Sequence, residues 1–202
     1  MLLEFRVRNY RSIRDEQALI LIASSDKELA STHLAPTGLK AAPFALRTAV
    51  VYGPNASGKS SLLRALDYLR AVVAESATII QPGQTYNVQP FKLDPATAHR
   101  PTEFEITFLL SGVRHQYAFA MTPQRIVSES LLVYRSSKPT QLFSRQHVGK
   151  FYFSANNFLC KIYGVIKVII FCFANAFGGI YSPDDESLFL VNFSLFLFLF
   201  LR

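Results

Sequence analysis

The chain has 202 residues, of which 50% are hydrophobic and 17% are charged. This length allows one domain or two small ones, and the apolar content excludes an extended disordered chain. The composition changes near residue 150. Residues 1–150 contain 18 of the 21 Lys and Arg and 11 of the 14 Asp and Glu, and therefore the whole net charge of +7. Residues 151–202 contain 11 of the 18 Phe. We therefore divide the chain into a domain of residues 1–150 and a Phe- and Leu-rich tail of residues 151–202.

The cysteines and the N-terminus indicate the cellular compartment. Cys160 and Cys172 both lie in the tail, and two thiols are too few for a disulfide scaffold or a four-ligand metal site. The first 14 residues contain four arginines and no continuous apolar run, unlike a secretory signal peptide. We therefore expect a cytoplasmic protein.

The first 43 residues predict two strands and a loop. Leu3, Phe5 and Val7 alternate with charged residues, which predicts a strand with one buried face. Residues 9–12 form a plausible turn, and residues 17–22 are a second β-favouring run. The polar stretch of residues 24–43 predicts a surface loop.

A strand and a helix are predicted on either side of a glycine-rich segment. Residues 48–52 carry no charge, which is typical of a strand covered on both faces, and Gly53 ends it. The pattern then changes to a helical period, in which one face is made by the apolar residues Leu62, Leu63, Leu66, Leu69, Val72 and Val73.

An antiparallel meander is predicted downstream. Residues 103–110 and 113–121 are strand-like runs joined at Ser111 and Gly112, and this Gly can supply the positive φ of a tight turn. Residues 126–134 predict a further strand. The fold class is therefore α/β, in which a strand, a glycine turn and a helix form the core of a P-loop nucleotide-binding fold.

The glycine-rich segment fits the P-loop pattern G-x-x-x-x-G-K-[ST] at every fixed position. Glycines let backbone N–H groups approach the phosphates of a triphosphate, and the start of the following helix adds its positive dipole end. Lys59 is predicted to reach the β- and γ-phosphates, and the Ser60 hydroxyl is the predicted Mg²⁺ ligand. The candidate nucleotide-binding residues of this segment are Gly53, Pro54, Asn55, Ala56, Ser57, Gly58, Lys59, Ser60 and Ser61.

Several segments of residues 1–150 resemble the AAA-type ATPases of the SMC/RecF/OLD-like group, which have ABC-type ATPase heads and occur in DNA repair and in bacterial anti-phage systems. The resemblance rests on four parts of the sequence. These are Leu3, Phe5 and Val7 with Asn9, Tyr10, Arg11 and Ser12; the P-loop with Leu62, Leu63, Ala65 and Leu66; Pro90, Phe91, Lys92, Leu93 and Asp94; and residues 104–134.

The resemblance implies the N-terminal half of an ABC-type head, with ATP and Mg²⁺ as cofactors. In such heads the Asn-Tyr-Arg-Ser turn lies beside the nucleotide, so Arg11 and Ser12 become candidate contacts. Two heads sandwich ATP in these proteins, which implies a homodimer or a partner ATPase head. Nucleic acid is a further candidate partner, because Arg6, Arg8, Arg11 and Arg14, with Arg64 and Arg70, could favour a polyanion; a solvated strand face explains these arginines equally well.

The sequence departs from the family pattern in two respects. Ala56 stands where the motif usually has Gly, which the loop should tolerate. The chain also contains no Leu-Ser-Gly-Gly signature and no Walker B motif, since Asp184, Asp185 and Glu186 follow a turn rather than an apolar strand. Phosphoryl transfer to water needs an acidic residue for the metal's water shell and a group that orients the water. We therefore predict ATP binding, assign no catalytic residue, and do not expect hydrolysis by this chain alone.

The remaining candidates are weaker. Gln89 could approach the metal as the linker glutamine of ABC-type heads does, although it precedes a proline. The four histidines are scattered without ligand spacing and are interpreted as surface or loop residues rather than metal ligands: His33, His99, His115 and His147.

The tail allows three interpretations. Residues 162–181 are long enough to span a bilayer but contain Lys167. Residues 188–201 are more uniformly apolar but shorter than a membrane-spanning helix. The tail is therefore a frameshifted or truncated gene product, a membrane-seeking segment or an unusual core segment. The principal functional hypothesis is a truncated ATP-binding half-head; the alternative is a membrane-attached nucleotide-binding regulatory protein without hydrolysis.

Overall fold

The computed structural model describes residues 1–25, 29–75, 85–146 and 150–153. The tail interpretations and the acidic triplet at 184–186 lie outside these residues. The strands are β1 Leu2–Arg8, β2 Gln17–Ile20, β3 Leu34–Pro36, β4 Phe44–Leu46, β5 Thr102–Leu110, β6 Val113–Thr122, β7 Arg125–Tyr134, β8 Thr140–Gln146 and β9 Lys150–Phe153. The helices are α1 Ala30–His33, α2 Lys59–Glu75 and α3 Pro95–Ala98.

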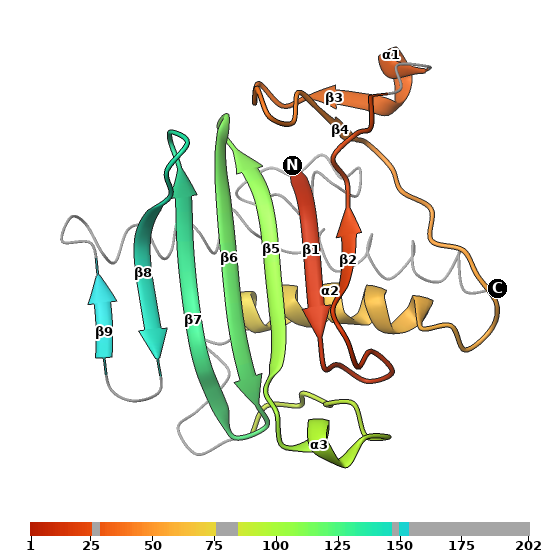
Figure 1. The fold of residues 1–202 in the computed structure, drawn as a ribbon, viewed down its shortest axis with the longest axis vertical. Helices are drawn as coiled ribbons and strands as arrows, with labels where there is room; N and C mark the ends of the chain where they lie inside the picture. Colours follow the sequence, from red (N-terminus) through yellow and green to blue (C-terminus); the bar gives the residue numbers. More distant parts are fainter. Residues whose placement is uncertain (26–28, 76–84, 147–149, 154–202) are drawn as a thin grey trace.

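Seven of the strands form one antiparallel sheet in the order β2-β1-β5-β6-β7-β8-β9 (Figure 1). The run from β5 to β9 is a meander of sequential neighbours, whereas β1 pairs with β5 across about a hundred intervening residues, with Phe5 opposite Ile106. The predicted antiparallel meander is confirmed. β3 and β4 form a separate two-stranded sheet.

The main core lies between α2 and one face of the large sheet, as Figure 1 shows with α2 crossing behind the strands. The apolar face of α2 contributes Ala65, Leu66, Leu69, Val72 and Val73, and the sheet contributes residues such as Phe5, Phe104 and Phe108. The predicted helix and its buried face are therefore confirmed. So is the alternation in β1, because Phe5 and Val7 are buried while Arg6 and Arg8 are not.

The predicted hairpin is present, with Ser111 at φ 47° and Gly112 at φ 74° between β5 and β6. Two successive positive φ values are typical of a type I′ turn, which matches the twist of the flanking strands. The last predicted strand, residues 126–134, is β7.

The strand predicted at residues 48–52 is wrong. This segment has no assigned strand conformation, and Val50 and Tyr52 are 75% and 90% exposed. An apolar run becomes a strand only if another strand accepts its hydrogen bonds, and none of the described strands lies beside it. The P-loop therefore follows an extended segment that leads from β4 to α2.

The surface loop predicted at residues 24–43 is only partly correct. Within it the structure forms α1 and β3, and β3 pairs with β4. β4 in turn is tied to the end of the second β-favouring run, because Ile22 bridges to Ala45 and the Leu46 N–H donates to the Leu21 carbonyl at 2.7 Å.

Candidate functional site

The P-loop enters α2 through three residues with positive φ. Gly58 has φ 94° and Gly53 has φ 156°, while Ala56, at φ 63°, adopts the left-handed conformation that a side chain disfavours. The N–H groups of Ser61 and Leu62 donate to the Gly58 carbonyl at 2.9 and 3.1 Å, so that the helical hydrogen bonds of α2 begin at Gly58. The preceding N–H groups lie at the positive end of the helix, where an anion is favoured.

Lys59 folds back over the loop. Its Nζ donates to the carbonyl oxygens of Gly53 and Pro54, both at 2.8 Å. Both contacts are exposed, and both acceptors are neutral, so a negatively charged phosphate oxygen that reached the same ammonium would bind it more strongly than these carbonyls do. The lysine of the motif is thus held on the loop rather than directed away from it.

The turn of residues 9–12 lies against the start of α2. The Ser12 and Ser61 hydroxyl oxygens lie 2.7 Å apart, within hydrogen-bond distance, and a Cβ built on Gly58 would lie 3.5 Å from Ser12 Oγ. The structure therefore brings Ser12 to the P-loop, as expected from the family resemblance.

The second residue expected from that turn has different contacts. The Arg11 guanidinium lies 5.7 Å from the Tyr10 ring centroid, and its Nε donates to the Tyr10 hydroxyl at 3.3 Å. The Arg11 N–H donates to the Gln89 carbonyl at 2.8 Å, which places Gln89 beside the turn. These contacts involve the backbone of Gln89 and do not test the proposed metal role of its side chain.

Asn9 anchors this turn, a role that the sequence analysis did not assign. Its side chain is 3% exposed, and its amide nitrogen donates to the carbonyls of Thr97, Arg100 and Pro101 at 3.0, 2.9 and 3.3 Å. Its amide oxygen accepts from the Phe91 N–H at 3.0 Å. The available clue was the residue type, because Asn tolerates the positive φ of 54° found here.

Tyr10 fixes the same turn from the core side. Its ring packs against Tyr68 and Phe104, with centroid distances of 5.9 and 5.6 Å, and its hydroxyl donates to the Arg64 carbonyl in α2 at 3.4 Å. Burial of the Tyr68 hydroxyl raises its pKa well above the ordinary value, so it stays protonated at physiological pH. The turn is thus fastened both to the sheet and to α2.

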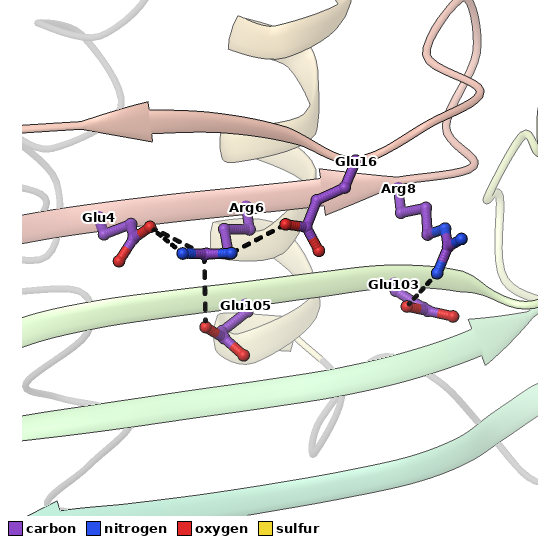
Figure 2. Close-up of polar contacts among 6 residues, drawn as sticks. All are labelled: Glu4, Arg6, Arg8, Glu16, Glu103 and Glu105. Carbon is purple, nitrogen blue, oxygen red and sulfur yellow. Dashed lines mark hydrogen bonds and ion pairs between the residues drawn. The ribbon is translucent and has the colours of Figure 1, made fainter.

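Most of the arginines named as candidates for polyanion binding are paired with carboxylates. Figure 2 shows Arg6 between Glu4 and Glu16, at 2.6 and 2.8 Å, on the sheet face turned away from α2. The remaining pairs are Arg6 with Glu105, Arg8 with Glu103, Arg14 with Asp15 and Arg70 with Asp67. The hydrogen bond and charge of Glu4, joined by those of Glu16, raise the pKa of Arg6. Arg6 and Arg8 lie in β1, so these two form part of a solvated, ion-paired strand face; the nucleic-acid partner stays a prediction.

One histidine differs from its predicted surface position. His115 is buried in β6, where its ring stacks on Phe108 at 5.2 Å and Nδ1 lies 2.9 Å from the Val113 carbonyl. Burial lowers its pKa, against a smaller opposing effect of the Val113 carbonyl. His33 and His99 are exposed as predicted. Over the described ranges, no group of His, Cys, Asp and Glu has the geometry of a metal site.

Within the part of the chain that the structure describes, no helix is both long and apolar enough to cross a bilayer. The membrane interpretation concerned residues 162–201, which lie outside that part.

Comparison with known proteins identifies the family. Residues 49–165 match the family described as "AAA domain, putative AbiEii toxin, Type IV TA system". The match begins four residues before the P-loop and includes α2 and the meander. No curated protein matches the chain. The AAA family consists of nucleotide-binding ATPases, which generally use ATP and Mg²⁺. With more than half of its length matched, the chain belongs to this AAA domain family.

Proposed function

We propose that this chain binds Mg²⁺–ATP at residues 53–61, with the turn that carries Arg11 and Ser12 at the edge of the site. The observation that carries the proposal is the arrangement of Lys59, whose ammonium group lies over the loop at the N-terminal end of α2. Membership of the AAA family supports it.

Each residue has a distinct proposed role. Glycine at positions 53 and 58 permits the backbone conformation that turns N–H groups toward the phosphates, Lys59 neutralises phosphate charge, and the Ser60 hydroxyl coordinates Mg²⁺. Bound Mg²⁺ would neutralise phosphate charge and order the triphosphate. No residue of the chain is proposed as the catalytic base.

The wider role that we propose is that of an ABC-type half-head of the SMC/RecF/OLD-like group, acting in anti-phage defence or DNA repair. The toxin-like description of the matching family supports the defence role. A partner ATPase head with a different sequence is the proposed source of the signature loop that this sequence lacks, because a second copy of this chain would lack it too.

The test is Mg²⁺-dependent ATP binding by the full chain, measured by isothermal titration calorimetry. Lys59→Ala is expected to weaken binding by about tenfold or more, since a charge-assisted hydrogen bond contributes about 1.5–3 kcal/mol. Lys40→Ala is the control for the loss of a lysine, because Lys40 is exposed and lies outside the P-loop. Equal affinity of the wild-type protein and Lys59→Ala would contradict the proposal.

Ser60→Ala separates the metal role from the phosphate role. This variant should lose most of the increase in ATP affinity that Mg²⁺ produces, while its binding of ATP in excess EDTA stays near that of the wild-type protein.

A further inference from the structure

The Ser12 and Ser61 hydroxyl oxygens lie 2.7 Å apart, within hydrogen-bond distance. Each hydroxyl has one hydrogen and two lone pairs, so either can donate in this contact. When Ser12 is the donor, Ser61 keeps its own hydrogen for another acceptor. A hydroxyl that accepts a hydrogen bond also becomes a stronger donor, because consecutive hydrogen bonds polarise one another.

Ser61 lies where the hydrogen of its hydroxyl can be donated to a bound ligand. It lies in the first turn of α2, two residues after Lys59, and its N–H already donates to the Gly58 carbonyl. Its backbone group is therefore engaged in starting the helix, and the side-chain hydroxyl is the group of Ser61 that can serve a ligand at this positive helix end.

Ser12 is held independently of the P-loop. The backbone N–H of Tyr10 donates to the Ile13 carbonyl and the N–H of Ile13 to the Tyr10 carbonyl, both at 2.8 Å, which closes the turn around Ser12. Tyr10 and Ile13 are buried in the core, and Asn9 fastens the start of the turn to the chain around α3. The Ser12 hydroxyl thus contacts α2 from a turn that the core and Asn9 hold in place.

Gly58 lies beside this contact. A Cβ at position 58 would stand 3.5 Å from Ser12 Oγ, within ordinary van der Waals contact, and φ at this residue is 94°. The space beside Ser12 would admit a Cβ, so the need for glycine at this position comes from the backbone conformation of the loop.

From this geometry we propose that Ser12 is a positioning residue of the nucleotide site: it acts through Ser61, orienting the Ser61 hydroxyl so that its hydrogen points to a phosphate oxygen of the bound nucleotide. The inference rests on the proposed function, because it requires a polyphosphate at the P-loop. It assigns the ligand contact to Ser61 and an indirect role to Ser12.

A double-mutant cycle tests this order of contacts. ATP affinity is measured by calorimetry for the full-length wild-type chain, Ser12→Ala, Ser61→Ala and the double variant. Ser12→Ala should weaken binding by about threefold and Ser61→Ala by about tenfold, the range expected for single hydrogen bonds. The double variant should bind like Ser61→Ala alone, because Ser12 has no effect once its acceptor is lost.

Rescue and stability measurements separate positioning from a general structural effect. Ser12→Thr keeps the hydroxyl at an exposed position and should restore wild-type affinity. Thr37→Val removes a buried hydroxyl that donates to the Ala42 carbonyl, in the segment between β3 and β4 and outside the P-loop. It should change thermal stability without changing ATP affinity.

The outcomes are distinguishable. If the losses of the two single variants add in the double variant, or if Ser12→Thr fails to restore binding, the positioning role is wrong while ATP binding stands. If the wild-type chain does not bind ATP, or binds it as well as Lys59→Ala does, the proposed function itself is wrong and this inference falls with it.

Discussion

At the scale of single residues, Asn9 shows how one side chain can organise a site that it does not enter. Its amide bonds four backbone groups between Phe91 and Pro101, at a position that is almost fully buried. Leaving such groups unpaired costs about 1–3 kcal/mol each. This anchoring explains why the turn beside the P-loop keeps its strained φ values at Asn9 and Arg11.

His115 leads to a prediction about pH. Burial lowers its pKa below the ordinary value of 6.5, so the unfolded chain takes up the proton at a higher pH than the folded chain does. The stabilising contribution of the neutral ring is complete above about pH 6.5 and is lost as the pH falls through the folded-state pKa. His115→Phe keeps the stacking on Phe108 and removes the titration.

We therefore expect the free energy of unfolding of the wild-type protein to fall relative to that of His115→Phe between pH 7 and pH 5, measured by urea denaturation. His99→Asn, at an exposed position, controls for the loss of a histidine and should follow the wild-type profile. Parallel profiles for the wild-type protein and His115→Phe would show that the ring is accessible to protons in the folded state.

At the scale of elements, α2 and the segment before it behave differently although both are apolar. The helix satisfies its own backbone hydrogen bonds and needs only a surface for one face, which the sheet supplies. The segment at residues 48–52 would need a neighbouring strand for its backbone and cover for two faces, and the described residues supply neither. The amino-acid composition of a segment does not show whether a neighbouring strand will be present.

Two valines test this difference. Val7 in β1 is 1% exposed, whereas Val50 is 75% exposed. Val7→Ala should lower the free energy of unfolding by about 2 kcal/mol, because it leaves a cavity in the core, and Val50→Ala should change it by less than about 0.5 kcal/mol. Chemical denaturation of both variants gives the comparison. A loss at Val50 as large as that at Val7 would mean that residues 48–52 are buried in the folded protein after all.

At the scale of the whole molecule, one core cluster connects α2 to most of the large sheet. Its residues and the apolar residues packed against them include members of α2, β1, β2, β5, β6, β7 and β8. The division of the chain near residue 150 stays a prediction; β9 lies at this position, since it begins at Lys150 and extends to Phe153.

The division predicts the behaviour of a shortened chain. A protein of residues 1–153 should unfold in a single cooperative transition in calorimetry, because its core contacts are internal. Leu69→Ala in the same chain should lower its stability by about 2–5 kcal/mol, since Leu69 is fully buried under the sheet. A broad transition without a heat-absorption peak would show that residues beyond 153 are needed to form the core.

Local sequence was sufficient for some of the fold. The repeat of Leu66 and Leu69 on one face of α2, the alternation of β1 and the Ser111-Gly112 turn all depend on residues within a few positions of one another, and each was predicted correctly. The P-loop was also recognisable from sequence, because the backbone conformation that it needs requires glycine at fixed spacings.

Only the tertiary structure decided the rest, because those features depend on residues far apart in the chain. The pairing of β1 with β5, the burial of His115 and the exposure of Val50 follow from which strands are neighbours. The contact of Ser12 with Ser61 likewise joins a turn near the N-terminus to a helix 49 residues later. Sequence alone determined that the chain carries the P-loop motif directly before a helix. The packing of β1 against that helix determined which turn lies beside the motif, because contacts between distant segments are set by the shared core and not by local pattern.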